Sequence, residues 1–136
     1  MREVVKGLKK LGVQLDLILT SPLVRAVETA EILAGSLGMN KKEIRQTPAL
    51  APGAIVDQLL TEIKNQASAQ SIAIVGHQPD LGHLISRIVQ SDDCVLSIQL
   101  KKGGICCINV SETVPTLRGD LMWLLTPKQL RMVAKA

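Results

Sequence analysis

The sequence predicts a three-layer α/β/α fold, with helices on both faces of a mixed, mainly parallel β-sheet. Two observations support this prediction. In residues 1–90, apolar runs typical of strands covered on both faces alternate with amphipathic, helix-like segments. The later residues form strand-like runs separated by turns, which indicates antiparallel strands near the end of the chain. A length of 136 residues fits a single domain with one core.

Local start and stop signals place the first elements. Residues 1–12 put apolar side chains on one helical face, and Gly12 suits the position after the last turn. No capping residue precedes this helix. Residues 13–21 predict a short strand. Residues 21–38 predict a helix with Ser21 as its N-cap, followed by Pro22 at the first helical position and Gly38 beyond the end.

The remaining elements follow from the same periodicities. Continuous apolar runs bounded by polar or glycine residues predict strands, and a 3.6-residue period predicts helices. We expect strands in residues 43–50, 71–77, 95–100, 103–110 and 116–125, and helices in residues 53–66, 79–90 and 127–136.

The composition narrows the class of ligand. The formal charge is +4, and the lysines are scattered in pairs, whereas a nucleic-acid footprint should cluster on one face. Phe and Tyr are absent and Trp123 is the single aromatic residue, so platforms for base stacking are missing. We therefore expect no nucleic-acid partner. A small anionic substrate fits this charge equally well.

The cysteines and the apolar segments indicate the compartment. Cys94, Cys106 and Cys107 make neither a disulfide framework nor a metal-ligand spacing, and the adjacent pair fits strand residues that point to opposite faces. No signal peptide and no apolar run near eighteen residues is present. We expect a cytoplasmic protein with reduced thiols, no membrane partner, and neither a metal nor a cofactor.

Two strand-to-helix junctions offer candidate functional side chains. Ligands of open α/β sheets bind at the carboxyl ends of the strands, and Arg25 and His77 both lie just beyond such ends. Helix N-termini present free N–H groups there, so the sequence predicts a phosphate-like anion site. Periodicity alone also allows Arg25 as a solvated surface residue and His77 as a cap of the next helix. We expect His83 to be exposed and inert, and Asp80 to interact with a helix dipole.

At these residues the chain resembles the histidine phosphatase superfamily, specifically the small SixA-type phosphohistidine phosphatases. Three segments carry the resemblance: LILTSPLVRAVETAEIL, IAIVGHQPDLGHLI and the ending MWLLTPKQLRMVAKA. The first is similar to the family signature S-P-x-x-R-A-x-x-T-A, with Arg25 and Thr29 in the arginine and threonine positions. The second is similar to an apolar strand leading to G/S-H-x-P-x-L-G, with His77 as its histidine.

The resemblance implies a phosphoglycerate-mutase-like fold and a set of roles. Arg25 would hold the phosphoryl oxygens, and His77 would hydrogen-bond the phosphoryl group and stabilise charge as the P–N bond breaks. We include Ser21 among the phosphate-binding residues. The implied substrate is a phosphohistidine on a phosphorelay protein, and a free phosphate anion is the simpler ligand of the same site.

The chain departs from the family pattern at its first strand. Family members carry R-H-G at the end of this strand, and that histidine is the nucleophile; no R-H-G occurs here. We expect residues 1–136 to be one N-terminally truncated histidine-phosphatase-like domain, with unpaired strand edges where the first strand would lie. Ala49 also replaces a common acidic residue, and Asp57 is a weak substitute as general acid.

Three hypotheses about function follow. The first is an N-terminally truncated copy, or a mis-started reading, of a phosphohistidine phosphatase, and the chain as given would be inactive without its nucleophile strand. The second is a catalytically inactive module of the same fold that binds phosphate or a phosphoprotein. In the third, His77 itself acts as the nucleophile with assistance from Arg25. The oligomeric state is left open.

Overall fold

The computed structural model describes residues 1–66, 68–90, 96–113 and 116–136. Its helices are α1 (Arg2–Lys10), α2 (Val24–Ser36), α3 (Val56–Asn65), α4 (Asp80–Val89) and α5 (Pro127–Lys135). Its strands are β1 (Leu17–Thr20), β2 (Ile44–Gln46), β3 (Ile72–Val75), β4 (Ile105–Glu112) and β5 (Arg118–Leu125). Two short 3₁₀ turns, Lys41–Glu43 and Pro48–Leu50, flank β2.

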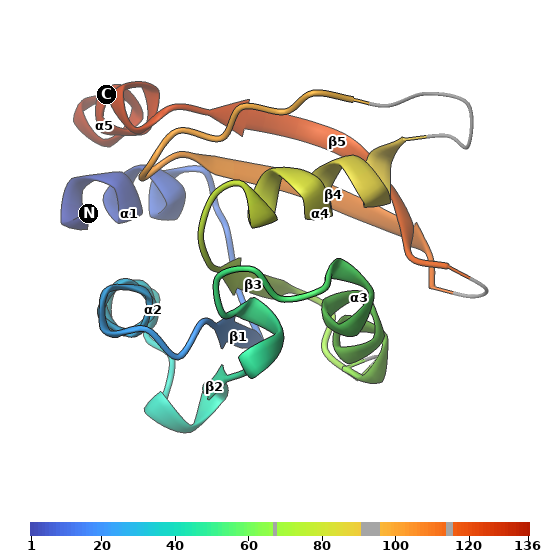
Figure 1. The fold of residues 1–136 in the computed structure, drawn as a ribbon. Coiled ribbons are helices and arrows are strands. Elements are labelled where there is room, and N and C mark those ends of the chain that lie inside the picture. Colours follow the sequence, from blue (N-terminus) through green and yellow to red (C-terminus); the bar gives the residue numbers. More distant parts are fainter. Residues whose placement is uncertain (67, 91–95, 114–115) are drawn as a thin grey trace.

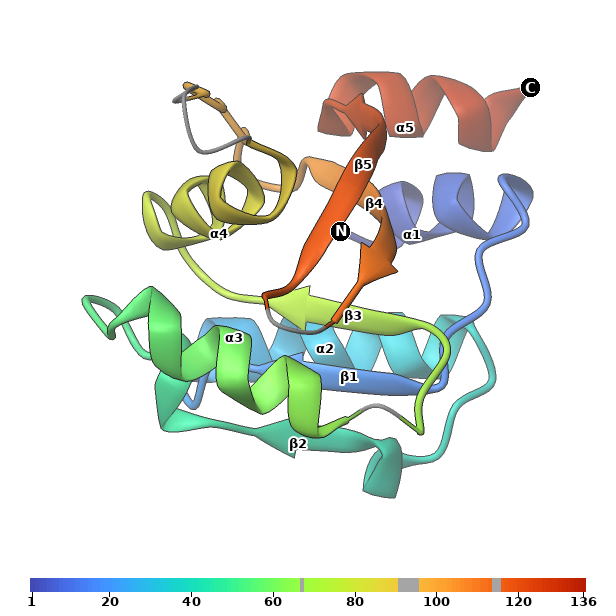
Figure 2. The ribbon, with the colours of Figure 1, turned by 90° about the vertical axis from the view of Figure 1, so that its right-hand side faces the viewer.

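The strands form two sheets. Strands β2, β1 and β3 make a parallel sheet in that order, and β4 pairs with β5 as an antiparallel hairpin. Figure 1 shows the hairpin above the parallel sheet, with α4 beside it and with α1 and α5 together at one end. Figure 2 shows α3 in front of the parallel sheet and α2 behind it. This arrangement confirms the predicted α/β class with helices on both faces of a parallel sheet.

Strand β1 separates two hydrophobic clusters. All four of its residues are buried, and alternate side chains point to opposite faces of the sheet. Ile18 packs in a cluster with residues of α1, α2 and α5, whereas Leu17 and Leu19 pack with residues of α3 and α4. The continuous apolar run of this strand is thus explained, because a central parallel strand must be apolar on both sides.

The helix ends agree with several sequence signals. Gly12 and Gly38 follow α1 and α2 with φ of 79° and 71°, a conformation that glycine adopts without a steric penalty. The N–H groups of Val13 and Met39 each reach back into the helix before them. The predicted glycine caps are therefore confirmed.

The start of α2 differs from the prediction. The helix begins at Val24 with Leu23 as its N-cap, not at Pro22 with Ser21 as the cap. The Ser21 N–H donates to the Val75 carbonyl at 2.9 Å, so it extends the pairing of β1 and β3. The Ser21 side chain accepts the Leu23 N–H at 3.2 Å and turns the chain before the helix begins.

A second difference lies in the predicted strand at residues 95–100. Residue 95 lies outside the described residues, and residues 96–100 form no strand. In place of a β-ladder, the Leu100 carbonyl accepts from the Gln78 side chain at 2.7 Å, and β4 pairs with β5. Gln78 lies at the start of α4, so this segment is tied to a helix.

Among the described residues, β2, β3, β4 and β5 each have one partner strand, so all four are edge strands. The partner of β3 is β1, and the partner of β4 is β5. All four residues of β3 are apolar but half-buried, unlike the fully buried residues of β1. The sequence predicts unpaired edges where the first strand of the family fold would lie.

Close packing of α1 on α5 generates a test of the fold. A side-chain carbon on Gly7 would meet the Leu130 carbonyl, whereas one on Gly35 of α2 would meet no atom within 4 Å. Overpacking costs about 1–3 kcal/mol, whereas Gly→Ala in an open helix gains about 0.5–1 kcal/mol. We predict that Gly7→Ala lowers the free energy of unfolding in urea, and that the matched variant Gly35→Ala leaves it unchanged or raises it. Equal stability of the two variants would contradict this packing.

Candidate phosphoryl-binding site

The pairing of β1 with β3 brings two loops to one edge of the parallel sheet. Thr20 lies opposite Val75 at the carboxyl ends of these strands, and the Ser21 N–H continues the ladder to the Val75 carbonyl. Ser21 therefore leads into α2 beside the loop that contains His77. The two junctions predicted from sequence lie together, as expected for parallel strands.

Ser21 and His77 are in direct contact across this edge. The His77 Nε2 atom lies 2.8 Å from the Ser21 Oγ atom, and the proton between them belongs to either group according to the tautomer. Ser21 has 0% of its surface exposed and also accepts the Leu23 N–H. The contact with this hydroxyl orients the half-buried imidazole. Because the hydroxyl is buried, it is not accessible as a nucleophile.

Arg25 lies in the first turn of α2, four residues after Ser21. Its side chain is exposed and lines a hollow between helices α1, α2 and α5. Within the described residues, no hydrogen bond joins Arg25 to His77, and none engages the backbone N–H groups of Val24 and Arg25. The guanidinium and these amides are thus available to an anion.

At the start of α4, backbone N–H groups that the sequence suggested would be free are already hydrogen-bonded. The Leu81 N–H donates to the His77 carbonyl, and the Gly82 N–H donates to the Gln78 side chain, each at 2.9 Å. The Asp80 carboxylate accepts the Gly53 N–H at 3.0 Å and adds negative charge to this turn. The expectation that both helix starts offer free amides is therefore corrected at α4.

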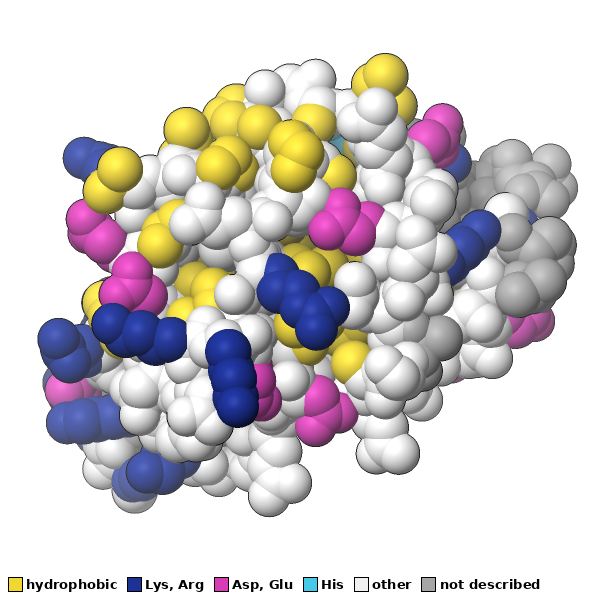
Figure 3. Space-filling model, turned by 90° about the horizontal axis from the view of Figure 1, so that it is seen from below, with side chains coloured by type: hydrophobic (Ala, Val, Ile, Leu, Met, Phe, Trp, Pro, Cys, Tyr) yellow, Lys and Arg dark blue, Asp and Glu magenta, His cyan; other side chains and the backbone are white. Residues whose placement is uncertain are grey.

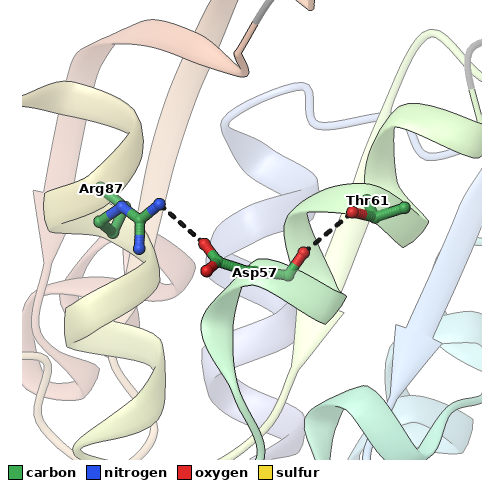
Figure 4. A network of polar contacts seen from close by, with 3 residues as sticks. All are labelled: Asp57, Thr61 and Arg87. Atoms are coloured by element: carbon green, nitrogen blue, oxygen red, sulfur yellow. Dashed lines mark hydrogen bonds and ion pairs between the residues drawn. The ribbon is translucent and has the colours of Figure 1, made fainter.

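Among the described residues, no hydrogen bond or ion pair joins the other ionisable candidates to Ser21. His83 is exposed on α4, as expected, and lines a different hollow, formed with residues 96–101. The Asp57 carboxylate accepts from Arg87, in the last turn of α4, at 2.9 Å, and the Asp57 carbonyl accepts from Thr61. Figure 4 shows Asp57 directed toward Arg87. This ion pair occupies the carboxylate of Asp57, the residue considered as a substitute general acid.

Sequence reasoning missed the part played by Gln78. Its side chain bonds both the Gly82 N–H and the Leu100 carbonyl, so it fixes the start of α4 and the segment before β4 together. It also missed Lys102 and Arg131, which line the same hollow as Arg25. No local pattern signals the contact of Gln78 with Leu100 or the proximity of Lys102 and Arg131 to Arg25, because both join segments distant in sequence.

Cys106 and Cys107 are free thiols on β4, where they pair with Leu124 and Trp123. Burial, with a smaller contribution from Cys107, raises the pKa of the Cys106 thiol to about 11. Burial also raises the pKa of the Cys107 thiol. The thiolate is the nucleophilic form, so neither residue is prepared for attack on phosphorus at neutral pH.

The charge on the surface is mixed in sign where it can be seen. On the face in Figure 3, Lys and Arg side chains occupy several separate places, with Asp and Glu side chains among them. Among the described residues, no helix is both long and apolar enough to cross a membrane.

Comparisons with known proteins agree with the motifs. Residues 1–51 match the family model of the histidine phosphatase superfamily (branch 1), a segment that includes Ser21 and Arg25. The predicted resemblance to this superfamily is confirmed. An uncharacterized protein of Picosynechococcus sp. (strain ATCC 27264 / PCC 7002 / PR-6) is 37% identical over 105 residues, which are 75% of this chain. The chain spans 61% of the length of that relative.

Two solved structures share the fold. The protein histidine phosphatase SixA in complex with tungstate superposes with a TM-score of 0.82 over 95% of this chain and 80% of that one, at 21% identity. A protein assigned as a phosphohistidine phosphatase SixA in Agrobacterium tumefaciens gives a TM-score of 0.69 over 93% of this chain and 78% of that one, at 20% identity. The predicted SixA-like fold is confirmed.

The Ser21–His77 contact predicts an effect on anion binding. Without the hydroxyl, the imidazole loses a fixed orientation, and a neutral hydrogen bond contributes about 0.5–1.5 kcal/mol. We predict that Ser21→Ala weakens the binding of inorganic phosphate about 3- to 10-fold in an NMR titration. The control Ser36→Ala, at the far end of α2, should bind like the unchanged chain. A Ser21→Ala variant with unaltered affinity would contradict the orienting role.

The raised pKa of Cys106 predicts slow alkylation. A thiol with a pKa of about 11 is ionised in about one molecule in 3,000 at pH 7.5, against about one in ten for a free cysteine. In a Cys94→Ser/Cys107→Ser chain, iodoacetamide should therefore react about 300-fold more slowly than with free cysteine. The rate should still rise with pH beyond pH 10, and a plateau reached by about pH 9.5 would show an ordinary thiol.

Proposed function

We propose that this chain forms the phosphoryl-binding part of a SixA-like phosphohistidine phosphatase. The substrate in this proposal is a phosphohistidine on a cytoplasmic phosphorelay protein. The observation that supports it most strongly is the contact of His77 with Ser21 at the sheet edge where the helix of Arg25 begins. The family match and the SixA-like fold agree with this chemistry.

The proposed roles follow from the atoms that each residue presents. Arg25 offers a planar fork of N–H donors suited to the non-bridging phosphoryl oxygens, and the nearby α2 amides add donors. His77, once it carries a proton on the ring nitrogen that faces the phosphoryl group, donates a further hydrogen bond. Ser21 keeps that imidazole oriented through its Oγ atom. These groups bind the transition-state charge and form no bond to phosphorus.

The nucleophile in this proposal is a histidine on a strand that residues 1–136 do not include. Its imidazole nitrogen would form a bond to phosphorus as the substrate P–N bond breaks, and the departing imidazole would leave with a proton. Water would then hydrolyse the new phosphohistidine and release phosphate. The unpaired edges of β3 and β4 are consistent with a further strand between the two sheets.

A second function, a phosphate- or phosphoprotein-binding module without turnover, is also supported by an observation. The chain has two histidines, and His83 is exposed and lines a hollow that does not include His77. The described residues therefore offer no paired histidine at the phosphoryl site. Both functions share the same anion site, and they differ in whether a phosphohistidine forms on the protein.

The shared anion site predicts the behaviour of an arginine variant. A hydrogen bond to a charged group contributes about 1.5–3 kcal/mol. Arg25→Ala should therefore lower the affinity for inorganic phosphate about 10- to 100-fold, as measured by isothermal titration calorimetry. The matched control is Arg45→Ala on β2, because the Arg45 guanidinium bonds Gln66 at 2.8 Å and not the site. Equal binding by both variants, or no binding by the unchanged chain, would refute the site.

Turnover separates the two functions. The chain is mixed with a ³²P-phosphohistidine protein, with and without a peptide that supplies an apolar strand ending in Arg-His-Gly. Phosphate release that requires the peptide would support the phosphatase. Binding without release in either mixture would favour the module. A labelled chain that forms without the peptide and disappears in His77→Ala would instead identify His77 as the nucleophile.

A further inference from the structure

A hollow of about 480 Å³ adjoins the phosphoryl site. It lies between α1, α2, α5 and the turn before β4. Arg25 lines it from α2, so the hollow and the phosphoryl site share one residue. No role in holding the phosphoryl group has been given to the rest of its lining.

The charge in this hollow is predominantly positive. Arg25, Lys102 and Arg131 supply three cations from three separate elements, and Glu28 supplies one carboxylate. In the described part of the chain, no hydrogen bond or ion pair engages the three cationic side chains. The mixed charge seen elsewhere is thus replaced here by an excess of unneutralised cations, which attracts anionic groups.

The backbone of these cations is held by packing. Arg131 follows Leu130, which has 0% of its surface exposed and packs in the core against α1. The turn that carries Lys102 is closed by a hydrogen bond from the Gly104 N–H to the Lys101 carbonyl at 2.7 Å. Gly103 in that turn has a φ of 82° and approaches Pro127 at the start of α5. The two cations therefore extend from fixed positions.

The walls of the hollow are partly apolar. Val4, Ile32 and Pro127 line it beside the cations. A free inorganic anion uses the charges alone, whereas a peptide with carboxylate and aliphatic side chains matches both kinds of surface. Aromatic residues that could stack on bases do not line it.

We propose that this hollow recognises an acidic segment of the phosphoprotein substrate, with Lys102 and Arg131 binding its Asp or Glu carboxylates. The inference rests on the proposed function, because Arg25 then bridges the transferred phosphoryl group and the acidic segment. Lys102 and Arg131 are specificity-determining residues in this account. They select substrates whose phosphohistidine is flanked by carboxylates, and they do not act on the phosphorus atom.

The test uses two probes on the 136-residue chain. One is inorganic phosphate, followed by calorimetry. The other is a dye-labelled nonapeptide of alternating Glu and Leu, followed by fluorescence anisotropy, with a Gln-for-Glu peptide as its neutral counterpart. The variant is Lys102→Ala/Arg131→Ala. Its matched control is Lys41→Ala/Lys42→Ala, which removes the same charge from the 3₁₀ turn before β2.

We expect the Lys102→Ala/Arg131→Ala chain to bind the acidic peptide at least 10-fold more weakly, with phosphate affinity within 2-fold of the unchanged chain. The control should bind both probes normally, and Arg25→Ala should weaken both. A higher salt concentration should weaken the binding of the acidic peptide, because salt screens the charges. Both side chains are exposed, so the melting temperature should not change and serves as the check of folding.

Three results would overturn the inference while leaving the phosphoryl site intact. These are equal peptide affinity in the variant and its control, equal affinity for the Glu and Gln peptides, and no peptide binding by an unchanged chain that binds phosphate. Preferential binding of a single-stranded oligonucleotide through Lys102 and Arg131 would also overturn it. If the unchanged chain binds neither probe, the proposed function fails together with this inference.

Discussion

The parallel pairing of β1 with β3 brings the two loops of the site to one edge and places Ser21 beside His77. In register, Thr20 lies opposite Val75, and the Ser21 N–H adds one further ladder bond to the Val75 carbonyl. His77 follows two residues later and reaches the Ser21 hydroxyl at 2.8 Å. A slip of one residue would exchange the packing of Ile18 with that of Leu17 and Leu19, and it would separate the serine from the imidazole. The core and the site therefore depend on the same register.

The division of the strands into two sheets relates the fold to the proposed phosphatase activity. Half-buried apolar residues on β3 show that this strand is covered less completely than β1. An additional strand between β3 and β4 would bury these residues and satisfy the free edges of both strands. In the proposed phosphatase, the same strand would carry the nucleophile. The stability of the sheet and the catalytic activity would then both depend on this one strand.

The sequence predicted those structural features that depend only on residues close together in the chain. The glycine caps Gly12 and Gly38 and the apolar run of β1 were recognisable, because each is set by backbone conformation or by periodicity. The start of α2 was not, since a ladder bond to β3 holds Ser21 out of the helix. The contact of Ser21 with His77, 56 positions apart, was inferred only as a common edge. Lys102 and Arg131 gave no signal, because their proximity to Arg25 arises from the docking of α5.

A crystal structure of the chain with bound phosphate tests the central claim most directly. The account predicts one phosphate ion within hydrogen-bond distance of both the Arg25 guanidinium and a His77 ring nitrogen, with Ser21 Oγ still in contact with the imidazole. A phosphate ion bound elsewhere, or an Arg25 side chain directed away from an ion held by His77, would contradict it.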